Sequence, residues 1–246
     1  MISADYESRK SDRTEFSIPK NGGTGWRTPL ITSEFGVIPS PQAYLIEQGP
    51  NSVSSPHFHV QNQFQLVVAG SATLGKHPVR PISVHYAQRE TGYGPINAGE
   101  EGVSYLTLRP NMDKGSLHLP ENRHLMHEGM LKRQVTADLN ISTEAALCDR
   151  KEVAVEEAIP QQTDGLAAWL LRLPAGARFT APNSVPGAGR FHVVAAGAMC
   201  LGADRFQRLG CVFTFPDEGP LQFVADESGL ELMVLQFPVD PLPPKP

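Results

Sequence analysis

The sequence predicts an all-β fold made from two copies of one module. Three observations support this prediction: short apolar runs that end at glycine or proline, little long helical periodicity, and a repeat between the two halves of the chain. The 22 glycines and 22 prolines are spread along the chain and separate the apolar runs. Turns separate the strands of a β protein in the same way.

The expected strands are apolar runs with the length and composition of strands, each ending near a turn residue. In chain order they are residues 43–49, 64–70, 82–87, 103–110, 167–174, 191–197, 211–216 and 230–238. Two other segments, residues 120–128 and 143–158, carry a modest helical pattern. We therefore expect mostly strands, with short helices near the middle of the chain.

The repeat relates residues 63–70, QFQLVVAG, to residues 190–197, RFHVVAAG, at an offset of 127 with four identical positions. The same offset places GVSYLTL, from Gly102, on GLELMVL, from Gly229. Two separated matches at one offset are typical of a duplicated structural unit. The expected organisation is an N-terminal arm at 1–40, a first module at 41–112, a connector with short helices at 113–160, a second module at 161–240 and a tail at 241–246.

Composition excludes several classes of function. The net charge of −5 and the isoelectric point near 5.9, without a basic patch, argue against a nucleic-acid partner. No apolar stretch is long enough to span a membrane and the N-terminus lacks the apolar core of a signal peptide, so a cytoplasmic protein is expected. The three cysteines are odd in number and show no CxxC spacing, which predicts reduced thiols. The expected partner is a small molecule, and the N-terminal arm could join two copies as a homodimer.

The candidate site begins at residues 56–59, PHFH. Alternate side chains of an extended strand share a face, so His57 and His59 point the same way. By the same alternation, Gln63 and Gln65 share one face of the following strand, opposite its apolar residues. The pattern predicts that imidazoles and carboxamides converge on one site.

This spacing resembles the first motif of the cupin superfamily, in which His-x-His is followed after three or four residues by Glu and after six more by Gly. Here His57 and His59 are followed after three residues by Gln63 and after six more by Gly70. The second cupin motif supplies another histidine, and in this chain Tyr93 stands at that position. The resemblance implies two double-stranded β-helix barrels of the jelly-roll kind, an arrangement called a bicupin.

The resemblance also implies one divalent transition metal in the first barrel, with iron favoured and nickel, manganese, zinc and copper also open. The implied ligands are His57, His59, Gln63 and Tyr93, and the last two are also the implied catalytic groups. A carboxamide and a phenol replace the family's carboxylate and imidazole, which weakens the attraction for a dication. His85 is a rival third ligand, and together with Gln65 it is expected in the substrate pocket.

The second module shows no metal-ligand set of the family type. Arg190 stands at the carboxylate position, and the segment aligned with PHFH has no histidine. Arg190 and His192 share a strand face, where a salt bridge from the arginine to an acidic residue is expected and an anion site is the alternative. The second module is therefore predicted to be a degenerate copy.

A second histidine cluster lies in the connector, at residues 117–129. A short helix there would place His124 and Glu128 four residues apart on one face, a spacing that suits zinc when a third ligand is present. A solvated connector helix is the favoured interpretation.

The sequence leaves more than one function open. The first is a metal-dependent enzyme that acts on a small organic molecule, with dioxygenase-like chemistry favoured by the resemblance. The alternative is a bicupin that binds or senses a small molecule without catalysis, which the loss of the carboxylate and of the second ligand set favours. A purely structural module would leave two histidines on one strand unexplained.

Overall fold

The computed structural model describes residues 1–18, 23–34, 36–183 and 187–239. Within this part of the chain most of the regular structure is strand, with one short α-helix and two 3-10 segments, so the predicted all-β class is confirmed. The chain forms two compact units: among the described residues, the first module lies within residues 12–139, and the second module combines residues 1–11 with those between 140 and 239. The predicted tail at 241–246 lies outside the described residues.

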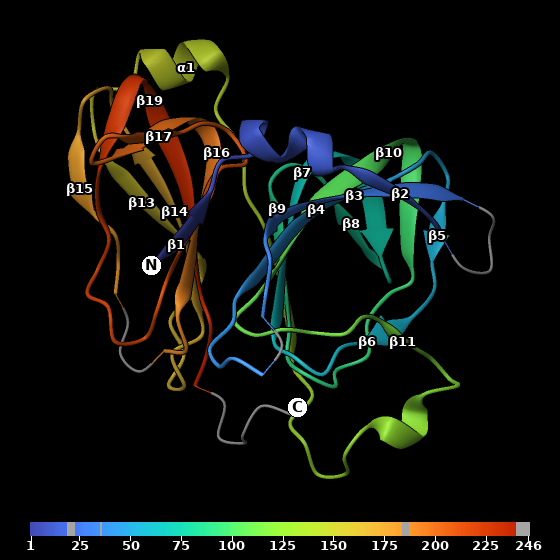
Figure 1. The fold of residues 1–246 in the computed structure, drawn as a ribbon. Helices are drawn as coiled ribbons and strands as arrows, with labels where there is room; N and C mark the ends of the chain where they lie inside the picture. Colours follow the sequence, from blue (N-terminus) through green and yellow to red (C-terminus); the bar gives the residue numbers. More distant parts are fainter. Residues whose placement is uncertain (19–22, 35, 184–186, 240–246) are drawn as a thin grey trace. The chain divides into compact units, whose positions relative to one another are not determined.

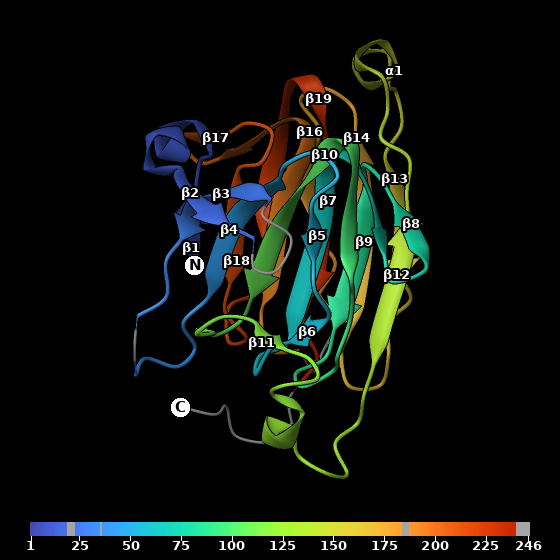
Figure 2. The same cartoon turned by 90° about the vertical axis from the view of Figure 1, so that its right-hand side faces the viewer.

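The first module contains a nine-stranded sheet with the order β12-β9-β7-β10-β4-β3-β2, to which β5 and β8 add at β10 and β7. Figure 2 shows β9, β7 and β10 running side by side, as the pairing requires. A separate pair, β6 with β11, lies at one end of these strands (Figure 1). The bounds are β2 Thr14–Ser17, β3 Thr24–Ile31, β4 Gln42–Gln48, β5 Val53–Ser54, β6 His57–Phe58, β7 Gln63–Leu74, β8 His77–Val79, β9 Ser83–Ala87, β10 Ile96–Arg109, β11 Leu117–His118 and β12 Gln134–Asp138.

The second module contains an eight-stranded sheet with the order β1-β18-β16-β19-β14-β13, to which β15 and β17 add at β19 and β16. Its interior is a cluster of buried apolar side chains, mainly from β14, β16 and β19. The bounds are β1 Ile2–Ala4, β13 Ala154–Ile159, β14 Ala167–Leu173, β15 Arg178–Thr180, β16 Arg190–Leu201, β17 Asp204–Phe206, β18 Cys211–Thr214 and β19 Gln222–Gln236, with the helix α1 at Glu144–Cys148.

The two sheets repeat one strand order. The run β9-β7-β10-β4-β3 of the first module corresponds to β18-β16-β19-β14-β13 of the second. Strands β7 and β16 begin and end 127 residues apart, which is the offset of the sequence repeat. Among the described residues no pairing joins the two edge strands of either sheet, so the two closed barrels are not confirmed.

A pair of glycines recurs in each module where two long strands bulge past each other. Gly70 and Gly102 have positive φ, and so do Gly197 and Gly229 at the same offset. A Cβ on Gly70 would lie 2.2 Å from the carbonyl oxygen of Gly102, and one on Gly197 would lie 2.0 Å from that of Gly229. Only glycine fits such a close backbone approach.

Residues 1–40 do not form a separate arm. Strand β1 pairs with β18 in the second module, while β2 and β3 extend the first sheet beyond β4. The 113–160 connector is also partly sheet, since β12 pairs with β9 and β13 pairs with β14. Edge pairing satisfies the backbone of these segments, which single-sequence periodicity does not reveal.

Both helix predictions in the connector were too long. The segment 143–158 gives only α1, capped by the Thr143 side chain, before its C-terminal end pairs with β14 as β13. The segment 120–128 gives a single 3-10 turn at Arg123–Leu125. His124 and Glu128 are both exposed there, so they do not form the helical face that zinc would need. Tertiary strand pairing overrides a weak helical propensity.

No helix in the described ranges is long and apolar enough to cross a membrane. The three cysteines are free thiols, as expected.

Gly197→Ala should destabilise the protein more than Gly176→Ala. Both glycines have positive φ, but nothing lies within 4 Å of a Cβ on Gly176. The control therefore carries only the backbone strain, roughly 1–2 kcal/mol, while Gly197→Ala adds overpacking of about 1–3 kcal/mol. Urea unfolding measures both. Equal losses would contradict the close approach at the bulge.

Candidate functional site

One cavity of the first module collects most of the predicted site residues. Its volume is about 310 Å³, the lower end of the range for small-molecule pockets. His57, His59, Gln63, Gln65 and Tyr93 all line it. The wall comes from β2, β4, β7 and β10 and from the segments around β6 and β11.

Backbone pairing brings the His57 and Tyr93 segments together. The His57 amide donates to the Tyr93 carbonyl at 3.1 Å, and the Tyr93 amide donates to the His57 carbonyl at 3.0 Å. The rings of His57 and His59 are 5.3 Å apart between centroids, and that of Tyr93 is 4.5 Å from His57. The structure therefore places the family's second-motif position beside its first.

Arg109, at the end of β10, is a functional residue that the sequence analysis missed. Its side chain lines the cavity and is 1% exposed. Its guanidinium donates to Oε1 of the Gln42 side chain at 2.6 Å, to the Tyr44 hydroxyl at 2.7 Å and to Oε1 of the Gln63 side chain. A signal was present, because alternation along β10 puts Arg109 on the face of Tyr105 and Thr107.

A directed chain of hydrogen bonds runs from Arg109 through the predicted ligands. Arg109 holds the Gln63 oxygen, so the Gln63 amide points to the Tyr93 hydroxyl and donates to it at 2.7 Å. The Nδ1 of His57 lies 2.8 Å from the Ser55 carbonyl, an acceptor, so His57 carries its proton there. The Tyr93 hydroxyl can then donate to Nε2 of His57, 2.9 Å away.

His59 is oriented by Asp113, a second residue that the sequence analysis missed. Nδ1 of His59 donates to Oδ1 of Asp113 at 2.9 Å, which leaves Nε2 as an acceptor 3.3 Å from the Arg109 guanidinium. The backbone amides of Val60 and Gly115 also donate to the Asp113 carboxylate. Both carboxylate oxygens are thus engaged by groups other than the arginine.

Burial fixes the protonation states around the cavity. It lowers the pKa of His57 to about 3, with a contribution from neighbouring His59, and it lowers the pKa of His59. Burial also raises the pKa of Tyr93 well above its usual range. For Asp113, burial alone would raise the pKa, but the hydrogen bond from His59 and the charge of Arg109 lower it to about 2. At neutral pH the histidines and tyrosine are uncharged, and Asp113 is ionised.

As arranged, the predicted ligand set does not fit a divalent metal. The Gln63 oxygen, the Tyr93 hydroxyl and Nε2 of His57 are already used in the hydrogen-bond chain, and none carries a negative charge. The Arg109 guanidinium also contacts His59 and Gln63, and its positive charge repels a metal cation. Within the described ranges, no group of three or more His, Cys, Asp or Glu could hold a metal ion.

His85 lines a smaller chamber that shares Gln65 and Tyr105 with the main cavity, and it does not line the main cavity itself. Its Nδ1 lies 2.9 Å from the Thr136 hydroxyl. Its ring centroid nevertheless lies 5.4 Å from that of Tyr93, so His85 is next to the other predicted ligands but lines a different space.

In the second module and the connector, the candidate residues that the structure describes are engaged by other groups. Arg190 donates to the Thr214 hydroxyl, to Asn183 and to the Glu218 backbone carbonyl, so the expected salt bridge is replaced by neutral acceptors. His192 is fully buried against Thr214. In the connector, His127 pairs with the buried carboxylate of Glu90.

Comparisons with known proteins find similar folds only among solved structures. No protein-family model and no curated protein sequence matches the chain. Among solved structures, a "putative dioxygenase" from Nostoc punctiforme is similar, with a TM-score of 0.60, 11% identity, and 94% of this chain and 85% of that chain covered. Oxalate decarboxylase from Bacillus subtilis is also similar, with a TM-score of 0.56, 13% identity, and coverage of 91% and 77%.

The chain has a cupin-like β fold. Both neighbours are cupin-fold proteins, so the comparison agrees with the resemblance seen in the two motifs. A further structure of the decarboxylase, with a TM-score of 0.55 and 13% identity, is described by its Mn(II) centres. At these identities the likeness concerns the fold, and the metal is a property of that neighbour.

Stability should fall as the pH drops from about 6.5 to about 4. Burial lowers the pKa of His85 to about 4 and that of His57 to about 3, whereas the ordinary value is 6.5. Below pH 6.5 the unfolded chain binds protons that the folded chain excludes, so the stability present above pH 6.5 is lost. Each such histidine contributes up to about 1.4 kcal/mol per pH unit.

Urea unfolding at pH 7, 6 and 5 measures this dependence. His85→Phe should reduce the slope of stability against pH by about 1 kcal/mol per unit. Gly176→Ala, which removes no titratable group, is the control and should leave the slope unchanged. An unchanged slope in His85→Phe would show that this histidine is not held neutral.

Proposed function

We propose that the first module binds a small organic anion, such as a monocarboxylate, in its polar cavity. Arg109 carries the proposal. Its guanidinium is almost fully buried, lines the cavity, and contacts only neutral groups among the described residues. Buried charges are normally paired, because an unpaired one loses its hydration without compensation. A carboxylate in the cavity would supply the missing partner.

The surrounding groups support an anionic ligand. His57 and Tyr93 are neutral, so they add hydrogen-bonding capacity without charge. The carboxylate of Asp113 is already held by His59 and two backbone amides, so it does not neutralise Arg109 by direct contact. A planar guanidinium suits a carboxylate in geometry as well as in charge.

A metal-dependent enzyme acting on a small organic molecule, with dioxygenase-like chemistry, is the competing proposal. One observation favours it: His59 donates from Nδ1 to a carboxylate and turns Nε2 inward, an orientation common among metal-binding histidines. This function would require Arg109 to leave the Gln63 oxygen and a metal to compensate for the absent carboxylate. The anion-binding proposal requires no rearrangement, and so we favour it.

Arg109→Gln should abolish or strongly weaken carboxylate binding. Loss of a buried charged partner costs about 2–5 kcal/mol of binding free energy. Isothermal titration calorimetry with a panel of straight-chain monocarboxylates measures the effect. Arg190→Gln is the matched control, because it removes a buried arginine of the second module. Equal affinity in wild type and Arg109→Gln would remove Arg109 from the site, and with it the proposed function.

A further inference from the structure

A polar row crosses the sheet of the first module next to Arg109. Thr136 on β12 lies opposite His85 on β9, His85 lies opposite Gln65 on β7, and Gln65 lies opposite Thr107 on β10. Residues directly opposite on antiparallel strands present their side chains to the same face. Arg109 is two residues beyond Thr107 on β10, one pleat repeat or about 7 Å along the strand.

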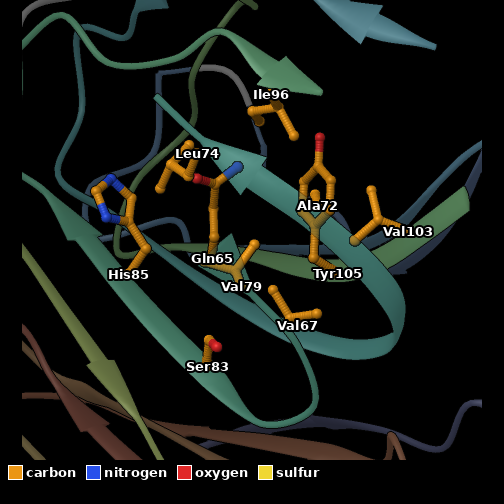
Figure 3. Close-up of a pocket in the computed structure, with 10 residues that line it drawn as sticks. All are labelled: Gln65, Val67, Ala72, Leu74, Val79, Ser83, His85, Ile96, Val103 and Tyr105. Atoms are coloured by element: carbon orange, nitrogen blue, oxygen red, sulfur yellow. The ribbon is translucent and has the colours of Figure 1, made fainter. Parts of the chain in front are cut away.

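This row borders two neighbouring spaces. Gln65 and Tyr105 line both the main cavity and the inner chamber, which we define by Gln65, Val67, Ala72, Leu74, Val79, Ser83, His85, Ile96, Val103 and Tyr105. Figure 3 shows these side chains around the chamber, with Gln65 between His85 and Tyr105. The chamber volume is about 20 Å³, enough for one water-sized group.

One buried polar atom at the chamber has no hydrogen-bond partner among the described residues. It is Nε2 of His85, whose Nδ1 is engaged by Thr136. The carboxamide of Gln65, which is 6% exposed, lines the chamber beside it. Buried polar groups are rarely left unpaired, because each costs the free energy of its lost hydration. The hydroxyls of Ser83 and Tyr105 are hydrogen-bonded to Asp138 and Gln48, and the other residues of the wall are aliphatic.

We propose that the inner chamber is a second subsite of the ligand and receives one hydroxyl group, hydrogen-bonded by His85 and Gln65. This inference rests on the proposed function, since the same ligand would hold its carboxylate at Arg109. The ligand class is then a hydroxycarboxylate. Its hydroxyl is several bonds from its carboxylate, because Arg109 lies about 7 Å along β10 from the polar row. The small volume admits the hydroxyl and excludes a larger substituent.

Calorimetry with matched pairs tests the subsite. Straight-chain monocarboxylates of three to six carbons are compared with the corresponding acids that carry a terminal hydroxyl. Wild type should bind the hydroxylated member of at least one pair about 5- to 100-fold more tightly, as for a hydrogen bond to buried groups. His85→Phe and Gln65→Leu should each lose this preference and keep their affinity for the plain carboxylate.

His192→Phe is the control, since His192 is a buried histidine of the second module that also has an unpartnered ring nitrogen. It should keep the preference for the hydroxyl. If wild type binds both members of every pair equally, a water fills the chamber, and the subsite is overturned while the anion site stands. If no carboxylate of either series binds, the proposed function and the subsite both fail.

Discussion

The arrangement of the first module depends on a buried guanidinium that touches no carboxylate directly. Arg109 is held by the side chains of Gln42, Tyr44, Gln63 and His59. Its charge sets the direction of the other hydrogen bonds, because the oxygen of Gln63 must face it and the amide must then face Tyr93. A buried cation whose direct hydrogen-bond partners are neutral attracts an anion and repels a second cation.

The repeat shows how one strand order carries polar inward side chains in one module and apolar ones in the other. At the offset of 127, the inward positions Tyr105, Thr107 and Arg109 correspond to Leu232, Val234 and Gln236. The leucine and the valine belong to the apolar core of the second module. The paired glycines at the strand bulges are common to both modules. The backbone has therefore kept its bulges while the inward side chains have diverged.

Much of the fold and part of the site could be predicted from sequence, because alternation and turn residues act locally. The strands were found from apolar runs, and the grouping of His57, His59 and Gln63 followed from the two-residue period. Arg109 was missed because its importance depends on the pairing of β10 with β7. This pairing is long-range, and local sequence patterns do not predict it. Asp113 lies in a loop and gains its role only through contact with His59. Most of β13 lies within the segment 143–158, which was expected to be helical, because this strand forms only through pairing with β14.

The metal content of the protein, purified without a histidine tag or chelator and measured by elemental analysis, tests the central claim most directly. If the Arg109 guanidinium takes the place of a metal ion, the protein should contain well under one equivalent of any transition metal per chain, even after reloading under reducing conditions. It also predicts that the double variant Arg109→Met with Gln63→Glu gains metal binding. Near one equivalent of iron, manganese, nickel, copper or zinc in the wild type, lost when His57 and His59 are both replaced by alanine, would contradict the account.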